Sequence, residues 1–258
     1  MQAKMISIIG LEYFPLVKAG DDLAKMIVET AKKNMISLED GDIVVVAQKV
    51  VSKAEGRVVK LRDVKPSERA KKMAKVSSKD PRFVELVLKE TKKVLKLSPE
   101  TLIVKNEKGL VCINAGMDKS NVSGKDSYAL LPKDPDESAE RIRSRILELT
   151  GKRVAVVISD TYSRPFRKGQ VEFAIGIAGI NPFKDYRGQG DLFNYTLKVK
   201  NIALVDEIAS AAELVMGQAK EAAPVVIIRN LNRAEPNEVF SIEDLSISRE
   251  EDLFRGTL

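Results

Sequence analysis

Residues 154–179 read VAVVISDTYSRPFRKGQVEFAIGIAG. The apolar run at 154–158 predicts a buried strand, which we expect to end at the polar residues 159–161. Three cations follow around a proline: Arg164, Arg167 and Lys168. A carboxylate and a hydroxyl at a strand end, followed by cations, suit a site for a metal ion and a phosphate. The pattern fits equally an ordinary solvated loop, in which Asp160 is a turn acid.

The composition is that of a globular protein. The chain has 258 residues, of which 44% are hydrophobic and 31% are charged. This length predicts a single domain over 1–258, with two intimate lobes as an option, and residues 231–258 form a terminal extension with little chemistry. A single cysteine, Cys112, excludes an intrachain disulfide, and we expect a cytoplasmic protein. The apolar runs are too short to cross a bilayer or to form a secretory signal, so no membrane partner is expected.

The chain contains no histidine, which restricts its chemistry. A Ser-His-Asp triad, a histidine base and histidine-ligated metals are excluded. A bound metal ion would therefore have oxygen ligands, which favours Mg²⁺ or Mn²⁺ over Zn²⁺. The net charge of +6 suits an anionic substrate. A nucleic-acid-binding module is the competing class, but the chain has no Trp and no interleaved basic and aromatic run, so no nucleic-acid partner is expected.

Strands and helices alternate irregularly along the chain. The expected strands are 5–9, 43–47, 101–105, 110–114, 154–158 and 225–228. The expected helices are 21–34, two within 65–97 divided at Asp80-Pro81, one after the loop 131–136, 206–216, and a short one beyond Arg229. This order predicts an α+β fold with mixed sheets and flanking helices. The sequence contains neither a P-loop motif nor a Rossmann glycine motif after a strand.

Three further segments could carry chemistry, and each has an ordinary structural alternative. Residues 48–56 follow a strand and offer Lys49 and Lys53 to a phosphate, or they begin a helix with exposed lysines. Residues 114–122 offer Asp118 to a metal ion and Asn121 to a nucleotide, or they form an Asx turn. Residues 216–220 offer the carbonyl oxygen of Gln218, or they cap a helix.

Eight motifs occur in a fixed order and identify a family resemblance. They are GDDL (20–23), VSKAEG (51–56), NAGMDKSN (114–121), LLPKDPD (130–136), SDTYSRPFRKGQ (159–170), AIGIAG (174–179), DEIASAAELVMGQ (206–218) and PVVIIR (224–229). In this order they resemble the coenzyme F420-0:γ-glutamyl ligase family, over roughly residues 10–230.

The resemblance implies a ligase that uses GTP to add L-glutamate to coenzyme F420-0, giving F420 with a γ-glutamyl tail. It implies a homodimer with a fold of the family's own, unlike ATP-grasp ligases. It also implies a requirement for Mn²⁺ or Mg²⁺, as two ions, and an activating K⁺. From the residues we expect an acyl-phosphate intermediate, because a free carboxylate is a poor acyl donor. The alternative is a related metal-dependent amino-acid ligase or phosphotransferase acting on another anionic acceptor.

The resemblance also implies site residues where the motifs match. The implied metal ligands are Asp118, Asp160, Thr161 and Gln218. The implied GTP contacts are Gly10, Leu11, Pro15, Gln48, Lys49, Lys53, Asn121, Met216, Gly217, Gln218, Ala219, Lys220, Glu221, Ala222 and Ala223. Two positions depart from the family pattern: Glu12-Tyr13-Phe14 replaces a shorter Gly-Leu-Pro turn, and Gln218 stands where some members have Glu. From their charge, we add Arg164 and Arg167 as catalytic candidates that stabilise the transferred phosphoryl group or bind an anionic substrate.

Overall fold

The structure, a computed structural model, describes residues 5–231, 239–248 and 250–253. The chain divides into two compact units. The first unit contains residues 1–14, 24–47 and 136–258, and the second contains residues 15–23 and 48–135.

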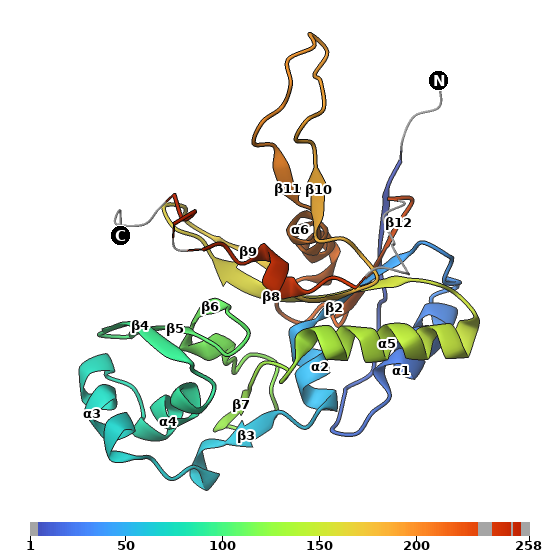
Figure 1. The fold of residues 1–258 in the computed structure, drawn as a ribbon. Coiled ribbons are helices and arrows are strands. Elements are labelled where there is room, and N and C mark those ends of the chain that lie inside the picture. The colour runs from blue at the N-terminus through green and yellow to red at the C-terminus, as the bar shows by residue number, and fades with distance from the viewer. Residues whose placement is uncertain (1–4, 232–238, 249, 254–258) are drawn as a thin grey trace. The chain divides into compact units, whose positions relative to one another are not determined.

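A five-stranded mixed sheet forms the centre of the first unit (Figure 1). Its strands, in spatial order, are β1 (Ser7–Gly10), β12 (Val225–Arg229), β2 (Ile43–Ala47), β8 (Ala155–Ser163) and β9 (Gln170–Ala178). Only β2 and β8 are parallel neighbours, and the other three pairs are antiparallel. The predicted strands at 43–47 and 225–228 are confirmed, and that at 5–9 is confirmed with a shift of one or two residues.

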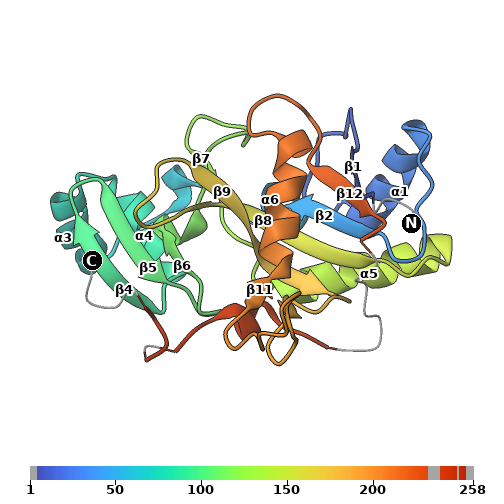
Figure 2. The same ribbon diagram turned by 90° about the horizontal axis from the view of Figure 1, so that it is seen from above.

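Helices cover both faces of this sheet, as Figures 1 and 2 show together. Helix α6 (Leu204–Met216) lies on one face, and α1 (Leu23–Lys33) and α5 (Pro135–Thr150) lie on the other. Because side chains alternate along a strand, Ile43 and Val45 of β2 face α6 and belong to one hydrophobic cluster with Val205 and Ile208. A sheet buried on both faces explains why β2 and β12 are almost entirely apolar.

Strand β8 continues past the end that the sequence predicts. The prediction that the strand stops at Ile158 is wrong, because β8 runs to Ser163 and pairs with β9 from Val156 to Ser163. The pairing register shifts between Ile158 and Ser159, which marks a bulge. Asp160 and Thr161 therefore lie on a strand rather than in a loop, and strand pairing holds their backbone. The hairpin loop itself contains only residues 164–169.

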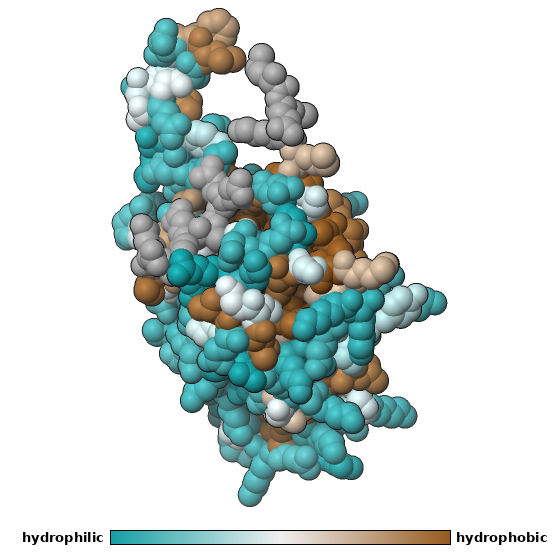
Figure 3. Space-filling view, turned by 90° about the vertical axis from the view of Figure 1, so that its right-hand side faces the viewer, coloured by the Kyte–Doolittle hydropathy of each residue, from teal (hydrophilic) through white to brown (hydrophobic). Residues whose placement is uncertain are grey.

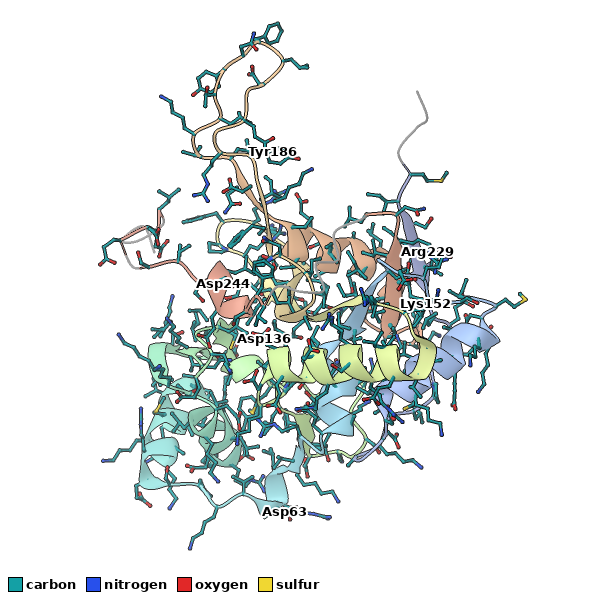
Figure 4. All side chains as sticks on the ribbon, turned by 45° about the vertical axis from the view of Figure 1, so that its right-hand side comes forward. Asp63, Asp136, Lys152, Tyr186, Arg229 and Asp244 are labelled. Atoms are coloured by element: carbon teal, nitrogen blue, oxygen red, sulfur yellow. The ribbon has the colours of Figure 1, made fainter. Side chains whose placement is uncertain are left out.

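A long hairpin, the arm (residues 183–203), projects from the first unit beside α6 (Figure 1). Strands β10 (Phe183–Asp185) and β11 (Asn201–Ala203) form its base. Backbone hydrogen bonds extend the pairing outward, including Tyr186 N to Lys200 O at 2.9 Å and Leu197 N to Gln189 O at 2.9 Å. Figure 4 marks Tyr186 on this projection. The residue pattern predicts no strand in this segment.

Hydrogen bonds to Asp136 connect α5, β9 and the segment that contains residues 241 and 242. One carboxylate oxygen accepts a hydrogen bond from the backbone N–H of Ile177 at 2.8 Å, in β9. The other accepts from the Ser241 hydroxyl at 2.8 Å and from Ile242 N at 3.0 Å. These bonds hold the short 3₁₀ helix η3 (Ile242–Leu245), where Asp244 lies, against α5 and β9 (Figure 4). The helix expected beyond Arg229 is thus a single 3₁₀ turn, and residues 232–238, 249 and 254–258 lie outside the described residues.

The second unit combines short helices with two small sheets. In chain order its elements are α2 (Gln48–Ala54), β3 (Val58–Lys60), η1 (Leu61–Asp63), α3 (Glu68–Ser77), α4 (Pro81–Lys89), β4 (Lys93–Ser98), β5 (Thr101–Lys105), β6 (Val111–Ile113), η2 (Asn114–Gly116) and β7 (Ser127–Ala129). Strands β4, β5 and β6 form one antiparallel sheet, and β3 pairs with β7 in another. The predicted hairpin of 101–105 with 110–114 is confirmed by the pair β5 and β6.

The predicted division of the helical region at Asp80-Pro81 is confirmed. Ser67 caps α3 by accepting from Ala70 N, and Asp80 caps α4, where Pro81 is the first residue. The prediction of helix up to Leu97 is wrong, because residues 93–98 form strand β4. Pairing with β5, and packing of Val94 and Leu97 onto the unit's core, override the helical propensity of this lysine-rich segment.

The described chain therefore has the α+β fold that the sequence predicts, with mixed and antiparallel sheets and flanking helices. Of the helices in its described parts, none is both long enough and apolar enough to span a bilayer.

Candidate active site

The hairpin of β8 and β9 carries the first group of candidate residues. Thr161 pairs with Glu172 across the hairpin, and Ser159 pairs with Ala174 two residues further from the hairpin loop. Because residues two apart on a strand share a face, Ser159 and Thr161 lie on the face that Ala174 packs toward α6. Ser159 is buried, and its hydroxyl has no hydrogen-bond partner among the described residues. The polar end of β8 thus lies beneath the carboxyl-terminal part of α6.

Glu172, Thr161 and Gln218 form a hydrogen-bonded cluster. Glu172 Oε1 accepts from Thr161 Oγ1 at 2.7 Å and from Gln218 Nε2 at 2.9 Å. The oxygens Thr161 Oγ1 and Gln218 Oε1 lie 3.2 Å apart. Glu172 is only 3% exposed, whereas Gln218 is exposed. The structure therefore brings together two of the predicted metal ligands, Thr161 and Gln218, around a buried carboxyl group.

A second carboxyl group adjoins this cluster. Burial raises the pKa of Glu213, a hydrogen bond from Gln218 opposes that rise, and the nearby charges of Glu172 and Glu221 add to it. Glu213 Oε2 is buried without a hydrogen-bond partner among the described residues. Negative charge is therefore concentrated under the loop that follows α6, which favours a cation there.

The loop of residues 216–223 begins at Gly217, which caps α6 with φ of 67°. A Cβ at this glycine would lie 2.4 Å from the carboxyl carbon of Glu221, whose carboxylate accepts from Ala219 N at 2.7 Å. The predicted GTP loop lies against the N-terminal turn, because Phe14 N donates to Ala222 O at 3.0 Å. This loop contains Met216, Gly217, Gln218, Ala219, Lys220, Glu221, Ala222 and Ala223.

The N-terminal turn of residues 10–14 adjoins the same loop. Gly10 ends β1, and a Cβ there would lie 3.6 Å from a methyl group of Val215 on α6. Leu11 is fully buried, and its N–H donates to Val225 O at 2.9 Å. Neither the side chain nor the N–H of Leu11 is thus available to a ligand. Pro15, the next predicted contact, is exposed and belongs to the second unit.

In the second unit, Lys49 and Asp118 form an ion pair. Lys49 Nζ lies 2.6 Å from Asp118 Oδ2, and it also donates to Ser120 Oγ at 2.5 Å. Ser120 N donates to the other oxygen of Asp118 at 2.7 Å. Burial acts to raise the pKa of Asp118, but Lys49 and these hydrogen bonds outweigh it and leave that pKa below its usual value. A predicted phosphate contact therefore neutralises a predicted metal ligand.

The other predicted contacts of this unit have different environments. Gln48 is buried and donates to Ser52 Oγ at 2.9 Å and to Leu130 O at 3.3 Å, so its amide supports α2. Burial and the charge of Lys49 lower the pKa of Lys53. Asn121 is exposed and adopts a left-handed backbone with φ of 54°. The segment 48–54 is helical, as the structural alternative for it predicts.

Arg164 and Arg167 lie in the tip of the β8–β9 hairpin. Arg164 is half-buried, and its Nε is buried without a hydrogen-bond partner among the described residues. Arg167 is exposed. An unsatisfied buried guanidinium nitrogen is costly, which supports a bound acceptor for Arg164.

The candidate ligands thus fall into two groups. Asp160, Thr161 and Gln218 belong to the first unit, and Asp118 belongs to the second. Within the described ranges, no three Asp, Glu or Cys side chains converge as a ready-made metal site. Sequence reasoning missed Glu172, although a single acid within the apolar strand QVEFAIGIA was a signal that this position is special.

Comparison with known proteins agrees with the motif order. Residues 12–230 match the family described as F420-0:Gamma-glutamyl ligase. The chain belongs to this family. It is 44% identical to the coenzyme F420:L-glutamate ligase of Methanothermobacter thermautotrophicus over 97% of this chain and 99% of that protein. It is 46% identical to the enzyme of the same name from Archaeoglobus fulgidus over 98% of each chain, and 43% identical to that from Methanocaldococcus jannaschii over 99% of each. The match to these ligases therefore includes both units.

Proposed function

We propose that this protein is a GTP-dependent ligase that adds L-glutamate to coenzyme F420-0 and so builds the γ-glutamyl tail of F420. The observation that carries this proposal is the match over almost the whole chain to relatives named coenzyme F420:L-glutamate ligase. A ligase that joins an amine to a carboxylate must first activate the carboxylate, and GTP supplies the activating phosphoryl group.

The proposed reaction has two steps. A terminal carboxylate oxygen of F420-0 attacks the γ-phosphorus of GTP, the bond from that phosphorus to the bridging oxygen breaks, and GDP leaves with the electron pair. The amine nitrogen of glutamate then attacks the acyl carbon of the resulting acyl phosphate. The bond from this carbon to the phosphate oxygen breaks, inorganic phosphate leaves, and the nitrogen loses a proton to a carboxylate or water.

The predicted metal ligands suit Mn²⁺ or Mg²⁺ in their donor chemistry. All are oxygens: the carboxylates of Asp118 and Asp160, the hydroxyl of Thr161 and the amide oxygen of Gln218. The 3.2 Å between the oxygens of Thr161 and Gln218 is close to the roughly 3.0 Å that separates neighbouring ligands around an octahedral ion with bonds of about 2.1 Å. Two such ions would offset the phosphate charge during transfer. We also propose that K⁺ activates the enzyme.

Each unit, taken by itself, contains loops that we propose as GTP contacts. In the second unit, Lys49 and Lys53 repel each other, and an anion near them would relieve that repulsion. In the first unit, the loop 216–223 and the turn 10–14 lie against each other and present backbone groups to a ligand. We propose that Arg164 binds a phosphoryl oxygen or an acidic substrate, since its Nε lacks a partner.

We also propose a homodimer. The arm carries large apolar side chains that are almost fully exposed: Leu192 is 97% exposed, Phe193 90% and Val199 87%. Exposed apolar side chains that lie close together on a surface commonly mark a protein–protein interface. Figure 3 shows hydrophobic residues gathered at the tip of this projection. A second copy of the chain is the partner that we propose for them.

Product formation tests the function. F420-0, L-glutamate, GTP and Mn²⁺ are incubated with the protein, and the products are identified by mass spectrometry. We expect successive mass gains of one glutamate, formation of GDP, and loss of both in Asp160→Asn. Retained GTP hydrolysis without a mass gain on F420-0 would favour the alternative, a related ligase or phosphotransferase with another anionic acceptor.

A further inference from the structure

Glu172 is buried in an unusual environment. Its side chain is 3% exposed, and no Lys or Arg forms an ion pair with it in the part of the chain that the structure describes. A buried carboxyl group without a cationic partner is costly, so its presence in an otherwise apolar strand calls for an explanation. Its hydrogen bonds suggest the explanation: the two side chains that donate to it, Thr161 and Gln218, are both proposed metal ligands.

The number of available hydrogens determines how this cluster is arranged. Thr161 has a single hydroxyl hydrogen, and the shorter contact, 2.7 Å to Glu172 Oε1, takes it. Gln218 donates its amide nitrogen to the same carboxylate oxygen at 2.9 Å. The remaining 3.2 Å contact between Thr161 Oγ1 and Gln218 Oε1 then has no hydrogen between its two oxygens. Lone pairs of both oxygens are consequently left free to face a cation.

The cluster would be arranged differently without the carboxyl group. The hydroxyl of Thr161 would be free to donate to Gln218 Oε1, and both oxygens would then be used internally. Hydrogen bonds from outside the ligand shell commonly fix the orientation of metal ligands in this way. The position of Glu172 is itself fixed, since its backbone oxygen accepts from Ser210 Oγ of α6 at 2.8 Å and its strand pairs with β8.

We propose that Glu172 is a positioning residue: its carboxyl oxygen holds the Thr161 hydroxyl and the Gln218 amide so that their oxygens bind a divalent cation together. This inference rests on the proposed function, in which these two residues are metal ligands. The carboxyl group acts from behind the ligands and through hydrogen bonds, and it is not a ligand itself.

Direct titration with Mn²⁺, followed by the electron paramagnetic resonance signal of the free ion, tests the inference in the full-length protein. Glu172→Met keeps a similar volume and removes the acceptor, and we expect it to weaken Mn²⁺ binding about 10–100-fold. Glu172→Gln keeps one oxygen that can accept both hydrogen bonds, and we expect it to retain binding within about threefold of the wild type. Glu207→Gln, at an exposed position of α6, is the matched control and should bind Mn²⁺ as the wild type does.

The outcomes distinguish the possible roles. A loss in Glu172→Gln as large as that in Glu172→Met would mean that the charge acts directly on the ion and would overturn the positioning role. Unchanged binding in both variants, or no Mn²⁺ binding by the wild type, would also overturn it. If Glu172→Met does not fold, Glu172→Val offers a strand-compatible residue without an acceptor, and the same loss is expected.

Activity separates this inference from the proposed function. In the ligation assay, Glu172→Met should need about 10–100-fold more Mn²⁺ for half-maximal rate and should approach the wild-type kcat at saturating Mn²⁺. If the wild type forms no F420 product while Glu172→Met still weakens Mn²⁺ binding, the proposed function fails and the positioning role stands. If the wild type forms product and Glu172→Met has an unchanged Mn²⁺ requirement, only the positioning role fails.

Discussion

Lys49 Nζ lies 2.6 Å from Oδ2 of Asp118, so the ammonium group of one predicted site residue neutralises the carboxylate of another. The pair is partly buried, with 17% of the lysine side chain and 39% of the aspartate side chain exposed. A divalent cation that binds Asp118 has to replace this lysine or share the carboxylate with it. In the proposed enzyme, Lys49 then becomes free to contact an anionic phosphate.

The first prediction follows from this competition. Lys49→Met leaves Asp118 without its cation, and we expect a loss of about 1 kcal/mol of stability without metal, because Asp118 still reaches solvent. Added Mn²⁺ should stabilise this variant more than it stabilises the wild type. Chemical denaturation with EDTA and with Mn²⁺ measures both effects. Lys72→Met, at an exposed position of α3, is the control and should be stabilised by Mn²⁺ as much as the wild type is. If Mn²⁺ stabilises Lys49→Met only as much as it stabilises the wild type, Lys49 does not compete with the cation for Asp118.

The second prediction concerns the ion pair that closes the end of the central sheet. Arg229 of β12 donates from Nε and Nη2 to the two carboxylate oxygens of Asp42, each at 2.8 Å, and Nη2 also donates to Ser37 O at 2.7 Å. Figure 4 marks Arg229 at this end of the sheet. Asp42 is 1% exposed. Arg229→Met should therefore cost about 3–5 kcal/mol of unfolding free energy, because it leaves a buried charge unpaired.

A similar bidentate pair on the arm provides the control for Arg229. Arg187 donates to both oxygens of Asp185, but about half of each side chain is exposed. Arg187→Met should leave the denaturation midpoint unchanged. If Arg229→Met and Arg187→Met destabilise the protein equally, the burial of Asp42 does not determine how much stability is lost with its arginine partner.

The sequence predicts most of this fold where local chemistry and burial agree. Buried apolar runs locate β2 and β12, and the Ser67 and Asp80 caps locate the starts of α3 and α4. The failures occur where pairing with a distant segment decides the structure. Residues 93–98 form a strand only because β5 lies beside them, and β8 continues past Ile158 only because β9 pairs with its polar end.

The site is predicted by residue type rather than by its hydrogen bonds. Carboxylates and cations near strand ends indicate metal and phosphate, and the motif order indicates the family. Neither signal reveals that Glu172 joins Thr161 to Gln218, because this depends on cross-strand register and on the position of the α6 end. Nor does spacing reveal the pairing of Lys49 with Asp118, which are 69 positions apart in the chain.

The third prediction uses the pH dependence of stability. Burial raises the pKa of Asp206 above its usual 3.8, although a hydrogen bond from Ala174 N opposes the rise. The folded protein therefore binds this proton more tightly than the unfolded chain does. The stability from that proton is fully present below pH 3.8 and is lost as the pH rises through the folded pKa.

Asp206→Asn removes the charge and keeps an oxygen for Ala174 N. At pH 7 we expect this variant to be more stable than the wild type, and the difference should shrink as the pH falls toward 4. Denaturation of both proteins across this pH range measures the difference. A difference independent of pH would show that burial of this carboxyl group does not oppose its ionisation.

The fourth prediction concerns the arm. Leu192 and Phe193 are 97% and 90% exposed in the single chain, so their replacement should not destabilise the first unit. In the proposed homodimer each would be buried, and burial of such a side chain contributes about 1.5–3 kcal/mol. Since both subunits lose both side chains, Leu192→Ser with Phe193→Ser should raise the dimer dissociation constant by at least about 10,000-fold.

Sedimentation velocity over a range of concentrations tests this prediction. We expect a dimer for the wild type and a monomer for the double variant, with the same far-ultraviolet circular dichroism. Met35→Ser is the matched control, because Met35 is 94% exposed and lies at the end of α1 rather than on the arm, and it should remain dimeric. A monomeric wild type would contradict the homodimer itself. A double variant that remains dimeric would mean that the subunits associate through another surface and would leave the exposed apolar tip of the arm to a different partner.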